Sequence, residues 1–99
     1  MDDQDPFSDS IKIEIDGVLD LHHFSPKDLK TLIPVYIVEC INLNIFEVRI
    51  IHGKGKGVLR RTVHSLLENH PLVLEFKLDT GPSSWGSTVL RLKARGGRP

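Results

Sequence analysis

A short segment between an apolar stretch and a basic stretch carries the residues best suited to chemistry, His52-Gly53-Lys54-Gly55-Lys56-Gly57. Alternating glycines permit a tight turn and leave backbone amides open to an anion. The helix expected from about Val58 would direct the positive end of its dipole at the same place. An imidazole adds a group that titrates near neutrality. The segment therefore predicts a phosphate-binding loop beside an acid–base residue.

A second segment, Asp20-Leu21-His22-His23, ends a short expected strand at Val18–Leu21. The next expected strand, Ile45–Ile51, leads into His52. Strand, helix and strand in succession favour a right-handed parallel crossover, which places the two carboxyl ends side by side. Asp20 and His22 are therefore expected to meet His52 at one edge of the sheet.

Such a set suits phosphodiester cleavage, which needs a base, an acid and positive charge at the phosphorus. His22 and His52 are the expected base–acid pair, and Asp20 would orient a histidine or hold a metal. Lys54, Lys56 and the loop amides would stabilise the phosphate oxygens. With RNA the 2′-hydroxyl can attack and no metal is required, whereas with DNA water attacks and a divalent ion, Mg²⁺ or Mn²⁺, is favoured.

Other candidates have simpler interpretations. His23 is expected at the surface, and His64 and His70 are expected to be surface or capping residues. Trp85 lies in a loop, where it would either stack on a base or cap the core. The glycine segment matches neither common nucleotide-binding pattern, because Val58 stands where G-x-G-x-x-G needs its last glycine.

Charge is distributed unevenly although the formal net charge is +0. Residues 1–20 hold seven acidic residues and one basic residue, whereas residues 49–64 hold five basic residues and no acidic residue. These five are Arg49, Lys54, Lys56, Arg60 and Arg61, and residues 91–99 add four more. Each charge alone is typical of a solvated surface, but the cluster around the loop predicts binding of a polyanion.

The length of 99 residues indicates one domain. We expect a flexible acidic lead-in at 1–10, a domain at 11–93 and a basic tail at 94–99. No apolar run approaches the roughly 20 residues of a membrane span, and the acidic N-terminus does not resemble a signal peptide. Cys40 is expected to be a core thiol, which suits a reducing cytoplasm.

Hydrophobic spacing predicts the remaining elements. Residues 11–15 and Val18–Leu21 are expected to form a hairpin through Asp16-Gly17 or one irregular edge. A helix is expected from Ser25-Pro26 to about Leu43, with Pro34 inside it. The apolar strand at Ile45–Ile51 suits burial on both faces. The next helix, from Val58 to about residue 68, is expected to turn Val58, Leu59, Val63, Leu66 and Leu67 inward.

Further strands are expected at 72–78 and 87–92, joined by a loop. The order β-(β)-α-β-α-β-β predicts an α/β fold, a two-layer sandwich with a small mixed sheet.

Two motifs, taken in the order in which they occur along the chain, resemble the Smr (small MutS-related) domain. They are Leu19-Asp20-Leu21-His22 and Val48–Arg60, which contains His52-Gly53-Lys54-Gly55; the last strand, Gly86–Leu92, is also similar. The resemblance covers about residues 15–93, and the chain is similar to the stand-alone bacterial type. It implies a fold like the C-terminal domain of translation initiation factor three. It also implies nucleic-acid binding and, in several members, endonuclease activity on DNA or RNA.

Carried over by position, Asp20 and His22 match the D-L-H motif, and His52, Gly53 and Gly55 match the H-G-x-G motif. The family is linked to DNA recombination or repair and to ribosomes. The chain departs from it at His23, where many members have glycine. The expected function is therefore an endonuclease, with a non-catalytic nucleic-acid or ribosome-binding module as the alternative. The oligomeric state is left open.

Overall fold

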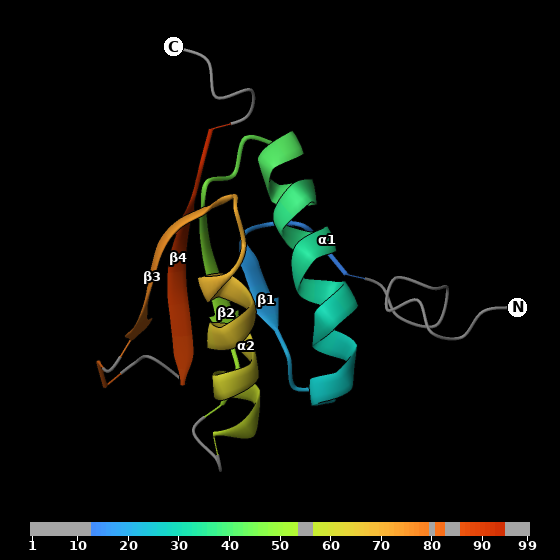
Figure 1. Cartoon of the computed structure of the whole chain (residues 1–99), viewed down its shortest axis with the longest axis vertical. Helices are drawn as coiled ribbons and strands as arrows, with labels where there is room; N and C mark the ends of the chain where they lie inside the picture. The colour runs from blue at the N-terminus through green and yellow to red at the C-terminus, as the bar shows by residue number, and fades with distance from the viewer. Residues whose placement is uncertain (1–12, 54–56, 80, 83–85, 95–99) are drawn as a thin grey trace, which may run out of the picture.

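The computed structural model of the chain describes residues 13–53, 57–79, 81–82 and 86–94. Several expectations lie outside these residues: the lead-in at 1–10, the segment Lys54-Gly55-Lys56, Trp85 and most of the basic tail. The described residues form a four-stranded sheet with two helices packed on one face (Figure 1). This arrangement confirms the predicted two-layer α/β sandwich.

The sheet has the order β1-β2-β4-β3. Its strands are β1 (Val18–Asp20), β2 (Glu47–Ile51), β3 (Val73–Asp79) and β4 (Ser87–Leu92). β1 pairs with β2 in parallel, whereas β4 runs antiparallel to both β2 and β3. The sheet is therefore mixed, as predicted, because only the connection from β1 to β2 is a parallel crossover between neighbours.

The first helical region begins with a short 3-10 turn, η1 (Pro26–Asp28), and continues as α1 (Leu29–Asn42). Asp28 Oδ2 accepts hydrogen bonds from the backbone N–H and the hydroxyl of Ser25, which fixes the entry to this region. Pro34 lies inside α1, which continues through it as one element. The region therefore starts at the predicted serine and proline.

The core lies between the sheet and the helices. Its buried residues come from β1, α1, β2, the second helix α2 (Val58–Glu68) and β4. They are Leu19, Leu21, Leu29, Leu32, Ile33, Tyr36, Ile37, Cys40, Ile41, Val48, Ile50, Val63, Leu67, Leu90 and Leu92. Cys40 is fully buried, as predicted, and burial raises the pKa of its thiol to about 11.

The prediction that β2 is buried on both faces was wrong. Only Val48 and Ile50 are buried, because both helices cover the same face of the sheet. The other face carries Glu47, Arg49 and Ile51, which are exposed or half-buried. The inward position of Val58 was also wrong: this residue is exposed at the start of α2, whereas Val63 and Leu67 are buried.

The expected hairpin before Val18 is not formed by residues 13–16, which are not in a strand. Asp16 Oδ1 accepts a hydrogen bond from the Val18 N–H, and the Gly17 N–H donates to the Tyr36 hydroxyl at 3.0 Å. The first bond closes the turn and the second attaches it to α1, while Ile13 and Ile15 pack against the core. β1 accordingly pairs with β2 alone among the described strands.

None of the helices within residues 13–53 and 57–79 is long and apolar enough to cross a membrane.

Candidate functional site

The carboxyl ends of β1 and β2 meet at one edge of the sheet. Asp20 pairs with Ile51 in the parallel ladder, and the Leu21 N–H donates to the Ile51 carbonyl at 2.9 Å. The two segments that follow, starting at His22 and at Gly53, therefore leave the sheet side by side. This confirms the prediction from the crossover rule that the two motifs share one edge.

Asp20 and His22 form an exposed acid–imidazole pair at this edge. Asp20 Oδ1 accepts the His22 backbone N–H at 3.0 Å, and Asp20 Oδ2 lies 4.0 Å from His22 Nδ1. The side chains are 58% and 70% exposed, respectively. The His22 ring also stacks on His23, with ring centroids 4.5 Å apart. The imidazole is open to a substrate and has a carboxylate near its ring, at a distance longer than a hydrogen bond.

His52 is placed very differently, because it is only 8% exposed. Its Nε2 lies 2.9 Å from Thr88 Oγ1, and its Nδ1 lies 3.2 Å from the Gly53 carbonyl oxygen. Burial lowers the pKa of His52, and the Arg60 guanidinium lowers it further, against the opposing effect of the Gly53 carbonyl. Both ring nitrogens are therefore already engaged with the protein.

The structure brings the backbones of the two motifs together but not the side chains of Asp20 and His52. Asp20 shares a register position with Ile51, so its side chain lies on the sheet face without helices. His52 follows Ile51 and is buried beneath α2, where it contacts His64. Neighbouring strand ends thus present these two side chains on opposite faces of the sheet.

His64 and Thr88 contact His52 at this site. The prediction that His64 is a surface or capping residue was wrong, because it is half-buried against Thr88 and Phe76, and Thr88 was not singled out from the sequence. His64 Nε2 lies 2.6 Å from Thr88 Oγ1, so one buried hydroxyl contacts both imidazoles. His64 lies three residues before Leu67, on the inner side of α2, and a polar residue there was a usable signal. Thr88 likewise shares the inward alternation of Leu90 and Leu92. By contrast, His23 is exposed and His70 Nδ1 accepts the Leu72 N–H, as expected for surface and capping residues.

The start of α2 gathers positive charge. Gly57 caps the helix with φ of +86°, and no acidic residue lies in the first turn. A Cβ at Gly57 would lie 2.9 Å from Arg60 Nη2 and 3.2 Å from Arg61 Nη1, so both guanidinium groups fold over the helix start. Two cations at the positive end of a helix dipole create a local field that favours an anion.

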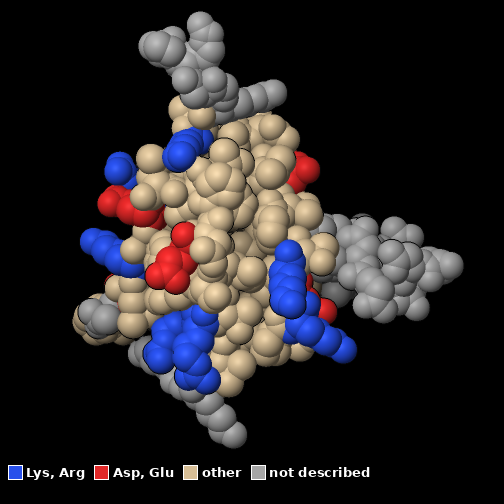
Figure 2. Space-filling view, in the orientation of Figure 1, with Lys and Arg blue, Asp and Glu red and all other residues tan. Residues whose placement is uncertain are grey.

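Figure 2 shows Lys and Arg side chains at the end of the molecule where both α1 and α2 begin, and others on the side formed by β3 and β4. Lys27 and Lys30 belong to the start of the first helical region, and Arg60 and Arg61 belong to the start of α2. This end is also the edge at which β1 and β2 finish. These four basic residues therefore belong to helix starts at the end of the molecule where β1 and β2 finish.

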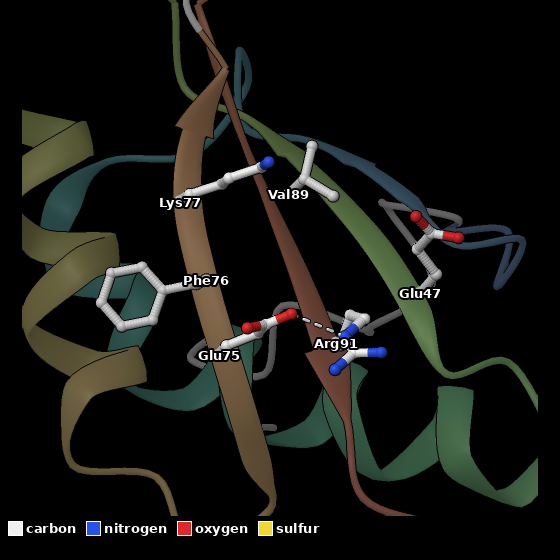
Figure 3. A pocket seen from close by; sticks show the side chains of 6 residues that line it. All are labelled: Glu47, Glu75, Phe76, Lys77, Val89 and Arg91. Atoms are coloured by element: carbon white, nitrogen blue, oxygen red, sulfur yellow. Dashed lines mark hydrogen bonds and ion pairs between the residues drawn. The ribbon is translucent and has the colours of Figure 1, made fainter.

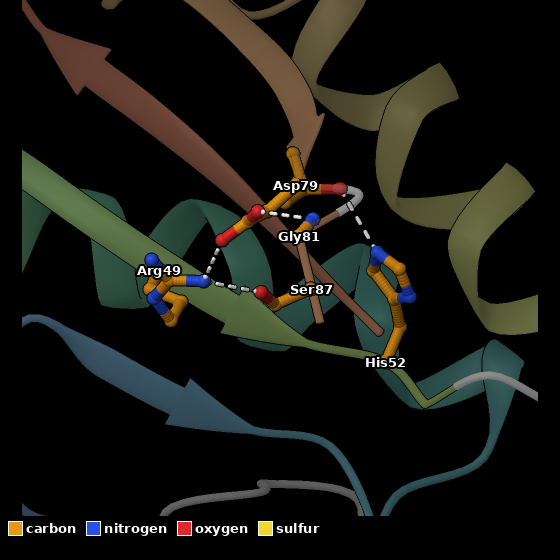
Figure 4. A network of polar contacts seen from close by, with 6 residues as sticks. Arg49, His52, Asp79, Gly81 and Ser87 are labelled. Atoms are coloured by element: carbon orange, nitrogen blue, oxygen red, sulfur yellow. Dashed lines mark hydrogen bonds and ion pairs between the residues drawn. The ribbon is translucent and has the colours of Figure 1, made fainter. Parts of the chain in front are cut away.

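Figure 4 shows a polar network near the same edge, on the sheet face that carries no helix. Arg49 Nη1 donates to Asp79 Oδ2 at 2.7 Å and to the Ser87 hydroxyl. The hydrogen bond from Arg49 is the main cause that lowers the pKa of Asp79, and the Gly81 N–H, which donates to Asp79 Oδ1, lowers it further. The network thus ties β2 to the ends of β3 and β4.

An open hollow of about 240 Å³ lies on the helix-free face of the sheet (Figure 3). Its lining includes the ion pair between Arg91 and Glu75, 2.8 Å apart, together with Glu47, Phe76, Lys77 and Val89. None of the residues predicted to do chemistry lines it. The hollow therefore does not change the location of the candidate site.

Within the part of the chain that the structure describes, no three His, Cys, Asp or Glu side chains form a group able to hold a metal ion. Asp20 and His22 alone supply two donor groups. A divalent ion here would need further ligands from substrate phosphates or water, as Mg²⁺ often does.

The chain was compared with known proteins. Residues 19–93 match the family model described as the Smr domain. The crystal structure of the Smr domain of Thermus thermophilus MutS2 is 27% identical, with a TM-score of 0.70 over 85% of this chain and 100% of that one. YdaL, a stand-alone small MutS-related protein from Escherichia coli, also has a TM-score of 0.70, at 20% identity over 78% of this chain and 64% of that one. The YdaL match shows the shared fold alone.

Curated relatives include two proteins named endonuclease MutS2. The one from Brevibacillus brevis is 36% identical over 87 residues, or 87% of this chain and 11% of the relative. The one from Clostridium botulinum strain 657 is 32% identical over 81 residues, or 81% of this chain and 10% of the relative. The chain thus spans about a tenth of the length of the curated relatives it matches.

Proposed function

Because the chain belongs to the Smr domain family, we propose that it binds DNA or RNA at the edge where β1 and β2 end and cleaves a phosphodiester bond there. Relatives named as endonucleases and the basic edge itself support this proposal. The observation that carries it is the position of Asp20 and His22. Their exposed side chains lie on the sheet edge next to the strand that leads into the glycine loop and α2.

Binding is assigned to the start of α2. Arg60 and Arg61 fold over Gly57, where the helix dipole is positive, and together they would contact backbone phosphates. Gly53 and the segment Lys54-Gly55-Lys56, whose lysines add charge, extend the same binding surface in the proposal. Trp85 is proposed to stack on a base.

Proton transfer is assigned first to His22. Neutral His22 would take the proton of the attacking oxygen while a bond forms from that oxygen to phosphorus. The bond from phosphorus to the leaving oxygen would break, and a water molecule would donate a proton to that oxygen. The hydroxide left behind would then take the proton held by His22. Asp20 would stabilise the imidazolium that forms. The attacking oxygen is the 2′-hydroxyl in RNA and water in DNA.

His52 has a different place in the proposal. Its ring nitrogens contact Thr88 and the Gly53 carbonyl, so it would exchange a proton with substrate only if one of these contacts were broken. With both contacts in place, His52 would support Gly53 rather than take part in the reaction. The hydrogen bonding of both His52 ring nitrogens within the protein is the observation that favours the second candidate function. That function is a nucleic-acid or ribosome-binding module without cleavage.

The decisive experiment incubates the protein with labelled single-stranded, duplex and branched DNA and RNA, and with ribosomes. Each substrate is tested with Mg²⁺, with Mn²⁺ and with EDTA. Cleavage in any arm supports the endonuclease and identifies the polymer and the metal requirement. Binding without cleavage in every arm supports the binding module, and no binding even at low salt would contradict both functions.

The binding surface is tested by Arg60→Gln together with Arg61→Gln. We expect weaker binding and a shallower dependence of log K on log salt, by about 0.9 per lost phosphate contact on duplex DNA. The matched control is Lys93→Gln, because Lys93 is an exposed cation just after Leu92, at the opposite end of β4 from Ser87. Equal losses in the control and in the double variant would contradict this location.

A further inference from the structure

The hydroxyl of Thr88 joins two imidazoles from different elements. It lies 2.9 Å from Nε2 of His52, at the end of β2, and 2.6 Å from Nε2 of His64, in α2. Thr88 is fully buried, and His64 is half-buried with its ring centroid 5.1 Å from that of Phe76. The three side chains therefore form a continuous polar contact between the sheet and α2, on the helix-covered face.

Proton counting fixes the direction of each hydrogen bond. A carbonyl oxygen only accepts, so His52 Nδ1 must carry the proton that it shares with the Gly53 carbonyl. Neutral His52 then has a bare Nε2, which must accept the single hydroxyl proton of Thr88. His64 Nε2 must in turn carry a proton and donate it to Thr88 Oγ1, because that hydroxyl has no second proton to give.

The surroundings favour two neutral rings. Burial lowers the pKa of both histidines, and the Arg60 guanidinium lowers it for both. His52 lowers the pKa of His64 further, and Glu68 opposes these effects at His64. The chain of donors thus runs from His64 to Thr88, from Thr88 to His52, and from His52 to Gly53.

The last bond in this chain reaches the glycine loop. The Gly53 N–H donates to the Gly86 carbonyl at 2.8 Å, and the Gly53 carbonyl accepts from His52. The first residue of the loop is thus fixed at both its N–H and its C=O. Gly53 has φ of +90°, so its peptide orientation sets the direction in which the loop leaves the sheet.

We propose that His64 is a positioning residue for Gly53, the first residue of the loop: by donating to Thr88 it directs the Thr88 hydroxyl proton toward Nε2 of His52, which favours the Nδ1–H tautomer that holds the Gly53 carbonyl. Without the His64 donor, the Thr88 hydroxyl is free to rotate and the alternative Nε2–H tautomer of His52 becomes accessible. In that tautomer Nδ1 of His52 carries a lone pair instead of a proton, so its hydrogen bond to the Gly53 carbonyl is lost. The expected effect of His64 on nucleic-acid binding rests on the proposed function, whereas its expected effect on the His52 tautomer does not.

The first test uses the unmodified protein without nucleic acid. Long-range ¹H–¹⁵N NMR spectra distinguish the two neutral tautomers of each histidine at neutral pH. We expect Nδ1–H for His52 and Nε2–H for His64. An Nε2–H tautomer at His52, or a bare Nε2 at His64, would overturn the proposal without bearing on the proposed function.

The second test compares paired variants. His64→Leu and Thr88→Val remove the donor and the hydroxyl, whereas His64→Gln and Thr88→Ser retain them. We expect mixed His52 tautomers and a shifted Gly53 amide signal in the first pair only. Binding to the best substrate should weaken about threefold to tenfold in that pair, the effect of about one net hydrogen bond.

Native-like spectra for the retaining variants separate loop positioning from a general loss of folding. If His64→Leu folds and keeps a single Nδ1–H tautomer at His52, the positioning role is overturned. If the tautomers change as expected but no variant, including the unmodified protein, binds nucleic acid, the proposed function fails and the positioning role stands.

Discussion

Asp20 and His52 lie at the ends of neighbouring parallel strands, yet their side chains leave opposite faces of the sheet. Asp20 shares its register position with Ile51, the residue before His52, and side chains alternate along a strand. Asp20 is consequently exposed beside His22, whereas His52 is buried beneath α2. In the proposed function the exposed pair would contact the substrate, whereas the buried histidine would hold Gly53.

Substitution of His22 tests which histidine transfers the proton. We expect His22→Ala to lower the single-turnover cleavage rate by about 10²-fold or more, the usual contribution of a general acid or base. Nucleic-acid affinity should change little, because the positive charge lies on other residues. The rate is measured at saturating protein on whichever substrate is cleaved.

His23→Ala is the matched control for that measurement, because His23 is also an exposed imidazole and stacks on His22. Asp20→Asn adds a second comparison, since an amide oxygen can still accept the His22 N–H while the negative charge is lost. We expect a smaller loss for Asp20→Asn than for His22→Ala. A larger loss in His23→Ala than in His22→Ala would contradict the assignment.

The two described glycines that flank the loop should respond differently to alanine. Gly53 and Gly57 both have positive φ, +90° and +86°, so each alanine should cost about 1–2 kcal/mol in the free energy of unfolding. A Cβ at Gly53 meets nothing within 4 Å, whereas one at Gly57 displaces the Arg60 guanidinium. Gly57→Ala should therefore weaken binding more than Gly53→Ala.

Denaturant unfolding and a binding titration on the same two variants check this difference. Comparable stabilities with weaker binding by Gly57→Ala are the expected result. Full affinity in Gly57→Ala would show that the position of Arg60 over the helix start does not matter for binding.

Buried His52 and half-buried His64 and His70 predict how stability depends on pH. Burial is the main cause that lowers the pKa of His52, His64 and His70 below the ordinary value of 6.5. Between the lowered and the ordinary pKa the unfolded chain binds more protons, so the free energy of unfolding decreases as pH falls. The loss begins near the ordinary value and is complete below the lowered values.

Denaturant unfolding between about pH 7.5 and pH 5 measures this dependence. His64→Gln should make it shallower, because one of the three shifted groups is removed while a donor to Thr88 remains. Stability that increases as the solution is acidified over this range would contradict the burial of these rings.

Tyr36→Phe tests the contact that orients the start of β1. The Tyr36 hydroxyl accepts the Gly17 N–H at 3.0 Å in the interior, and burial raises the pKa of Tyr36 to about 12. Removing the hydroxyl leaves a buried N–H without this partner, at a cost of about 1–3 kcal/mol. Thermal or denaturant unfolding reports the loss.

Val35→Ala provides the comparison, because Val35 is exposed on the same helix and should change stability by only about 0.5 kcal/mol. A Tyr36→Phe variant as stable as Val35→Ala would mean that the bond to Gly17 adds nothing to stability.

Local sequence signals were sufficient for most elements of the fold. Serine and proline at 25–26 marked the helix start, and alternation of apolar residues gave β4 with its observed bounds. The hairpin expected before Val18 failed because alternation in Ile13 and Ile15 reflects packing against the core, with no strand partner beside it. Likewise, the apolar run of β2 gave no indication that only one face would be covered.

For the candidate site, the sequence alone determined that the segments after Asp20 and after Ile51 would share an edge, because the handedness of a parallel crossover leaves little choice. Only the tertiary structure decided which side chains meet there. Thr88 lies 36 residues after His52 and 24 after His64, so no local pattern relates the three. Their contact depends on strand register and on the face that α2 covers, and both are set by packing of the whole chain.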